Sequence, residues 1–134
     1  MKQNRETGEA GRKFGLACGP RVAELLGARP LGGPSNECLW QGERVVVKCA
    51  RGSNDTVGVL LGMLERIDAV VGVFEVGIDR FVILRMSVAD YRAHMRERYR
   101  ENAAPQGMMS RSKFLKIGQH IQEIELRLDE PDER

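Results

Sequence analysis

One stretch of the chain, residues 36–50, constrains the fold more than any other. It reads Asn-Glu-Cys-Leu-Trp-Gln-Gly-Glu-Arg-Val-Val-Val-Lys-Cys-Ala and predicts two β-strands joined by a tight turn at Gln41-Gly42. Alternation along the second strand places Val46 and Lys48 on the same face. A lysine within β-branched residues requires an explanation, because burying an ammonium group without a partner is costly. We therefore expect the functional site at this hairpin, with Lys48 facing Glu37 across it.

The remaining apolar pattern predicts alternating helices and strands. We expect helices over residues 12–27, 57–67, 87–101 and 110–128, and strands over residues 68–76 and 81–86 beside the hairpin. This is an α/β fold with a central mixed sheet of about five strands flanked by helices, plus a C-terminal helix. We divide the chain into a disordered N-terminus (residues 1–10), an α/β core (residues 11–104), and a linker with an amphipathic helix (residues 105–134).

The predicted C-terminal helix carries an apolar seam with the 3-4-3-4 spacing of a heptad repeat. Its members are Phe114, Ile117, Ile121, Ile124 and Leu128. An exposed seam of this kind is unfavourable on a monomer. Either it folds back on the core of its own chain or it pairs with a second chain, and we expect a homodimer through this helix.

Composition places the chain among soluble globular proteins. It has 134 residues, of which 42% are hydrophobic and 30% are charged. No apolar run approaches the roughly 20 residues that cross a bilayer, so we expect no membrane partner, and the polar N-terminus shows no secretory signal. The widely spaced Cys18, Cys38 and Cys49 predict reduced thiols and a cytoplasmic location.

The hairpin resembles the core of the restriction-endonuclease-like nucleases, the PD-(D/E)-x-K group. Many members read acid, short strand, turn at glycine, then Val-Glu-Val-Lys and a small residue. Here Glu37 falls on the first acidic position, Gly42 on the turn and Lys48 on the lysine, whereas Val46 stands at the second carboxylate. The resemblance covers roughly residues 10 to 90 and implies a restriction-endonuclease-like fold.

The same resemblance implies a metal-dependent endodeoxyribonuclease. Glu37 and the backbone carbonyl of Val47 would bind Mg²⁺ or Mn²⁺, and Lys48 would assist the attacking water. Glu65, on the helix that follows, is the candidate replacement for the missing carboxylate. The expected catalytic residues are thus Lys48, Glu37 and Glu65. The competing interpretation is that Lys48 forms a structural ion pair with one of these acids.

Charge distribution points to DNA as the partner. Residues 92–116 contain seven lysines and arginines against Glu97 and Glu101. A basic segment of this kind is compatible with nucleic-acid contact. The candidate phosphate contacts are Arg92, Arg96, Arg98, Arg100, Arg111 and Lys113.

Two alternatives remain open at this stage. A catalytically inactive nuclease-like module, kept for DNA binding or protein assembly, would account for Val46. A protein-kinase small lobe would also place a strand lysine (Lys48) and a helix glutamate (Glu65) together. Residues 31–34 are not a G-x-G-x-x-G loop, however, and no H-R-D or D-F-G follows, which disfavours the kinase.

Overall fold

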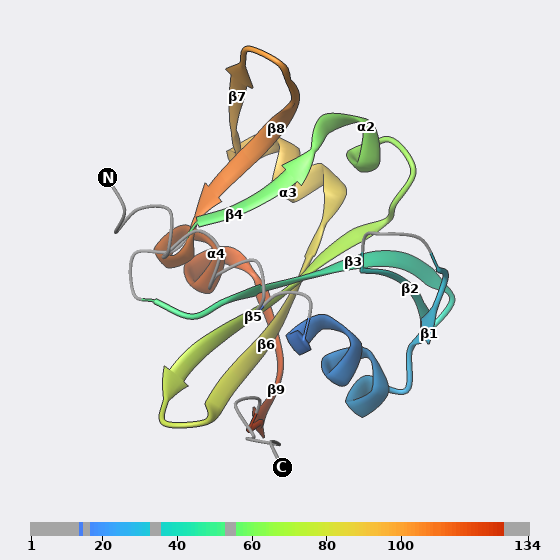
Figure 1. Cartoon of the computed structure of the whole chain (residues 1–134), viewed down its shortest axis with the longest axis vertical. Coiled ribbons are helices and arrows are strands. Elements are labelled where there is room, and N and C mark those ends of the chain that lie inside the picture. The colour runs from blue at the N-terminus through green and yellow to red at the C-terminus, as the bar shows by residue number, and fades with distance from the viewer. Residues whose placement is uncertain (1–13, 15–16, 33–35, 53–55, 128–134) are drawn as a thin grey trace.

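The computed structural model describes residue 14 and residues 17–32, 36–52 and 56–127. Residues 17–26 form a first helix (Figure 1). The elements after it are β1 (Arg29–Pro30), β2 (Glu37–Trp40), β3 (Glu43–Ala50), β4 (Thr56–Leu60), α2 (Leu61–Leu64), β5 (Ala69–Gly77), β6 (Arg80–Ser87), α3 (Val88–His94), β7 (Arg96–Arg100), β8 (Ala103–Ser110), α4 (Arg111–Ile117) and β9 (Gln119–Glu125). No helix in these ranges is long and apolar enough to cross a membrane. The predicted disorder of residues 1–10 lies outside them.

The main sheet is mixed and contains six of the described strands, in the order β1-β2-β3-β5-β6-β9. β3 and β5 run parallel, with Val46 opposite Val70 and Lys48 opposite Gly72. The other described neighbours in this sheet run antiparallel. The runs Val45–Val47 and Ala69–Phe74 are apolar on both faces because both faces of these central strands are covered.

A second, antiparallel sheet of the described chain has the order β4-β8-β7 and covers one face of the main sheet. Alternate residues of β3, β5 and β6 supply two separate cores. The core under the second sheet contains Val46, Val70, Phe74, Leu84, Tyr91 and Phe114. The opposite core, under the first helix, contains Val22, Val45, Val47, Val71, Phe81 and Leu126.

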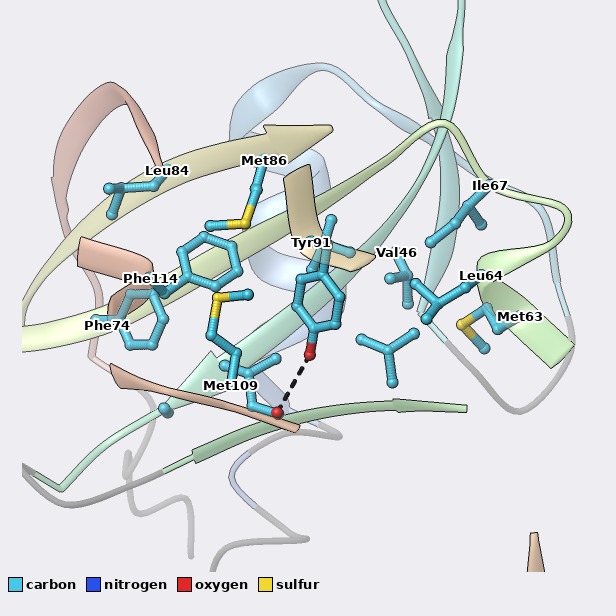
Figure 2. Packing of buried hydrophobic residues seen from close by; sticks show 14 of the residues in the cluster. Val46, Met63, Leu64, Ile67, Phe74, Leu84, Met86, Tyr91, Met109 and Phe114 are labelled. Atoms are coloured by element: carbon cyan, nitrogen blue, oxygen red, sulfur yellow. Dashed lines mark hydrogen bonds between the residues drawn. The ribbon is translucent and has the colours of Figure 1, made fainter. Parts of the chain in front are cut away.

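Tyr91 of α3 connects the second sheet to the core that lies under it (Figure 2). Its buried hydroxyl shares one hydrogen between the carbonyl oxygens of Gly107 in β8, at 2.8 Å, and Val57 in β4, at 3.2 Å. Burial raises the pKa of this phenol. Its ring packs edge-on to Phe114, with the ring centroids 6.4 Å apart. One side chain thus links two strands of the second sheet to the core beneath it.

Several predicted elements are confirmed. The β2–β3 hairpin turns at Gln41 and Gly42, both with positive φ (53° and 80°), as two-residue hairpin turns require. The two strands predicted over residues 68–76 and 81–86 are β5 and β6, joined by a turn with Asp79 at φ 56°. Ser87 caps α3 through its hydroxyl, which accepts a hydrogen bond from the backbone of Asp90.

Two predicted helices are wrong over much of their length. Residues 57–67 form β4 and the short α2, and residues 87–101 form α3 followed by β7. Helical spacing of the leucines in residues 60–64 hid the alternation of buried Val57 and Val59 with Gly58, which is typical of a strand. The α/β class and the mixed sheet are confirmed, but the main sheet has six described strands rather than about five.

The long C-terminal helix is also wrong, because α4 ends at Ile117 and residues 119–125 pair with β6 as β9. An irregularity in this pairing adds Ile121 to β9, so that Ile121 and Ile124 reach the same core although they are three residues apart. Phe114 is fully buried in the other core, where Ile117 packs against the same cluster. The described part of the seam is thus covered by its own chain, which removes the basis for a dimer through this helix; Leu128 lies outside the described residues.

The phenol of Tyr91 offers the first test of this architecture. Tyr91→Phe removes the shared hydrogen bond and should lower the free energy of unfolding by about 1–3 kcal/mol, measured by urea titration. Tyr99→Phe is the matched control: that hydroxyl is exposed and donates to Glu97, so its loss should change the stability by less than about 0.5 kcal/mol. Equal effects of the two variants would contradict the linking role of Tyr91.

Candidate functional site

Glu37, the first residue of the predicted metal site, is buried and ion-paired. Only 5% of its side chain is exposed. One carboxylate oxygen lies 2.6 Å from Nη2 of Arg66 and the other lies 3.2 Å from Nε of Arg44. The hydrogen bond to Glu37 raises the pKa of Arg66. Two cations therefore compensate the charge that was expected to bind a metal ion.

Lys48 lies on the same face of the main sheet as Glu37. Glu37 pairs with Val46, and Lys48 is two residues further along β3. Its side chain is mostly buried, and burial lowers its pKa. Within the described ranges the Lys48 ammonium makes no ion pair, so the alternative of a structural bridge to Glu37 or Glu65 is not what the structure forms.

The remaining acids near the hairpin do not complete a metal site. Glu65 is exposed at the end of α2 and makes no ion pair with another described residue. Glu43 lies on the opposite face of β3, where Arg85 binds both of its oxygens at 2.7 and 2.9 Å. Among the residues whose positions are described, no group of three or more His, Cys, Asp or Glu side chains could hold a metal ion. The described residues around the hairpin therefore do not fit the expected Mg²⁺ or Mn²⁺.

A disulfide bond lies next to the lysine, on the other face of β3. It joins Cys49 to Cys18 of the first helix, with the Cα atoms 6.4 Å apart. Cys38 is free and buried, and burial raises the pKa of its thiol. The prediction of reduced thiols is therefore wrong for Cys18 and Cys49. Wide spacing along the chain concealed this pair, because the fold brings the first helix onto β3.

Three of the candidate phosphate contacts, Arg96, Arg98 and Arg100, lie on β7 of the second sheet. β7 is an edge strand in which all five residues are exposed. Alternation places Arg96, Arg98 and Arg100 on one face of it. Arg96 lies opposite Met108 and Arg98 opposite Gln106 in β8. Because the intervening Gly107 is buried, these arginines belong to the outer face of the sheet, away from the core.

Two neighbouring hollows lie beside these arginines. One of about 280 Å³ is lined by Thr56, His94, Met95, Arg96, Met108, Met109, Ser110 and Lys113. The next, of about 330 Å³, is lined by Thr56, Arg96, Glu97, Arg98 and Met108. They share Arg96, with Lys113 at one end and Arg98 at the other. We define the outer basic face as Arg96, Arg98, Lys113, Thr56 and Ser110.

The basic residues of this segment, like Arg21 and Arg29, have no ion-pair partner among the described residues. Within the described residues, the arginines that form ion pairs are Arg44, Arg51, Arg66, Arg80, Arg85 and Arg127. The seven lysines and arginines of residues 92–116 form none with another described residue. Except at Arg111, whose guanidinium lies against Phe74, their charges are therefore available to an anionic partner.

Arg111 is an exception to the predicted set of phosphate contacts. Its guanidinium lies 5.7 Å from the ring centroid of Phe74, and its Nη1 atom is buried. It lines a different hollow, together with Arg51 and Glu75. Arg111 therefore turns towards the core and does not join the outer basic face, whereas Arg92 is exposed on α3.

Sequence reasoning missed the uncharged members of the outer basic face. Thr56 and Ser110 are brought together because β4 pairs with β8, with these two residues directly opposite each other. The alternation Thr-Val-Gly-Val in residues 56–59 was the available signal for the strand. Ser110, the pairing partner of Thr56, lies 54 positions later, and nothing in the sequence near either residue indicates this pairing.

Comparison with known proteins identifies no relative. No protein-family model, curated protein or solved structure matches the chain.

Burial of Lys48 makes a pH-dependent prediction. Because folding lowers the pKa of Lys48, the unfolded chain holds this proton more tightly than the folded protein does. The free energy of unfolding should therefore rise with pH until the pH reaches 10.5, the ordinary pKa of a lysine. Lys48→Met should be more stable at pH 7, by about 1.4 kcal/mol for each unit of lowering. The difference in free energy of unfolding between the variant and the parent should shrink as the pH approaches 10. Urea titration at several pH values measures this difference. A gap that stays constant with pH would show that Lys48 is solvated.

Proposed function

We propose that this protein binds DNA through the outer basic face of its second sheet, on a nuclease-like core that lacks the metal site. The observation that carries the proposal is the absence of ion pairs, among described residues, for the exposed arginines and lysines of this face. Elsewhere in the described chain, six arginines pair with carboxylates, and only Arg21 and Arg29 do not. Phosphate groups would supply the missing counter-charge.

The shape of the face supports the same proposal. Arg96 and Arg98 are two residues apart on one strand, so their Cα atoms are separated by about 6.5–7 Å. Lys113 extends the row of cations beyond the end of the strand, across the hollow that it shares with Arg96. The hydroxyl groups of Thr56 and Ser110 belong to the same hollow as Arg96 and Lys113 and are suitable donors to phosphate oxygens. A group of cations with neighbouring hydroxyl groups suits a sugar-phosphate backbone.

The nuclease-like part of the proposal is supported by the β2–β3 hairpin, in which Glu37 and Lys48 share a face. The same hairpin argues against cleavage. Arg44 and Arg66 bind the Glu37 carboxylate, and Val46 is fully buried in the core at the position of the second carboxylate. Binding without metal-dependent hydrolysis is therefore the function that the geometry favours.

Salt-dependent binding to a short DNA duplex tests the proposal. The slope of log K against log salt should fall by about 1.8 in the double variant Arg96→Gln/Lys113→Gln, because two phosphate contacts are lost at about 0.9 each. Fluorescence anisotropy at several salt concentrations measures both the affinity and the slope.

The matched control removes two charges from elsewhere on the surface. Arg21 and Arg29 are exposed and make no ion pair with another described residue, and Arg21 lies on the first helix, which covers the opposite core. Arg21→Gln/Arg29→Gln should leave the slope almost unchanged. Equal losses in both double variants would show that binding depends on net charge rather than on the outer basic face, and no binding by the parent protein would overturn the proposal.

A further inference from the structure

We propose that the tip of the β7–β8 hairpin enters the major groove of duplex DNA. This inference rests on the proposed DNA binding and extends it, because the outer basic face alone requires only phosphate contacts. It is carried by a separate feature of the second sheet, the point at which the third strand stops.

The hairpin extends past its neighbouring strand as a two-stranded arm. β4 ends at Leu60, opposite Gln106 of β8. On the other side Gln106 faces Arg98 of β7. Residues 99–105 therefore continue without a third strand beside them, and Figure 1 shows this end of β7 and β8 projecting from the body. Residues 99–104 are all exposed, and Pro105 at the base of the arm is half-buried.

The dimensions of the arm match the groove. Two paired strands lie about 4.8 Å apart, and the major groove of B-DNA, about 12 Å wide, admits a two-stranded ribbon. From Arg98 to the turn at Glu101 is three residues, or about 10 Å, close to the groove depth of about 8.5 Å. A sheet with β4 as its third strand would be wider, so the end of β4 sets how far the ribbon could enter.

A local irregularity adds twist to the arm. The register shifts between Arg98, opposite Gln106, and Arg100, opposite Ala103, which leaves an extra residue on β8. Bulges of this kind increase the right-handed twist of a ribbon. Pro105 lies in this extra segment, where its lack of an N–H group costs no ladder hydrogen bond. A strongly twisted ribbon can follow the curved floor of a groove better than a flat one.

The side chains at the tip have the chemistry of base edges and phosphates. Arg98 and Arg100 share a face and are free of ion pairs within the described chain. Arginine donates two hydrogen bonds to guanine, and asparagine pairs similarly with adenine. Asn102 stands at the turn with φ 62°. The acidic Glu97 lies on the other face of β7, where it accepts a hydrogen bond from Tyr99 at 2.6 Å.

Filling the major groove chemically tests the insertion. The probe is a short duplex in which every cytosine carries a glucosylated 5-hydroxymethyl group; the sugars occupy the major groove and leave the phosphate charge unchanged. The parent protein should bind this duplex at least about tenfold more weakly than the unmodified duplex, because the ribbon would meet the sugars in place of base edges. Fluorescence anisotropy at one fixed salt concentration compares the two duplexes with a single strand of the same length.

Protein variants separate the arm from the rest of the face. Arg98→Gln/Arg100→Gln should lose most of the preference for the unmodified duplex. Arg96→Gln/Lys113→Gln should bind both duplexes more weakly but keep their ratio. Circular dichroism confirms that each variant is folded.

Each outcome bears on one of the two proposals. Equal affinity for the filled and unfilled duplexes would overturn groove insertion and leave DNA binding by the outer basic face standing. Tighter binding to the single strand than to the duplex would overturn groove insertion in the same way. Absence of binding to every probe would overturn the proposed function itself, and the insertion with it.

Discussion

The parallel pairing of β3 and β5 is the constraint on which the rest of the structure depends. A hairpin cannot join two parallel strands, so the chain must cross one face of the sheet between Ala50 and Ala69. This crossover contains β4 and α2 instead of the usual single long helix. Once β4 lies over the sheet, β8 can pair with it and β7 can pair with β8. The second sheet, with its outer face and projecting arm, follows from one crossover.

The acids of the main sheet and the arginines of β7 differ in whether they form ion pairs. In the main sheet, Glu37 and Glu43 bind arginines from neighbouring elements, so the charges compensate each other within the fold. On the second sheet, Arg96 and Arg98 have no such partner among the described residues. Surface ion pairs contribute little stability, but leaving a row of like charges uncompensated is unfavourable unless an anion binds. These uncompensated charges are the basis for the proposed DNA binding.

The sequence predicted the elements whose signals are local. The β2–β3 turn carries a glycine, and the β5–β6 hairpin carries apolar runs, which specify them directly. Alternation in β3 correctly placed the side chains of Lys48 and Cys49 on different faces of the sheet. The errors arose where pairing is distant. The sequence of β9 predicts a helix because the extra residue at Ile121 gives this strand an i, i+3 pattern. For the site, the arginines could be identified from composition, but the partners of Glu37 could not, because Arg66 is 29 residues away in the chain.

The central claim is that DNA contacts the second sheet and not the β2–β3 hairpin. Amide hydrogen–deuterium exchange of the protein with and without a short duplex tests it most directly, because it reports every segment at once. The account predicts slower exchange in residues 94–110 when DNA is bound, and unchanged exchange in residues 36–50. Protection centred on Glu37 and Lys48, with none in β7 and β8, would contradict it and would place the nucleic acid at the nuclease-like hairpin.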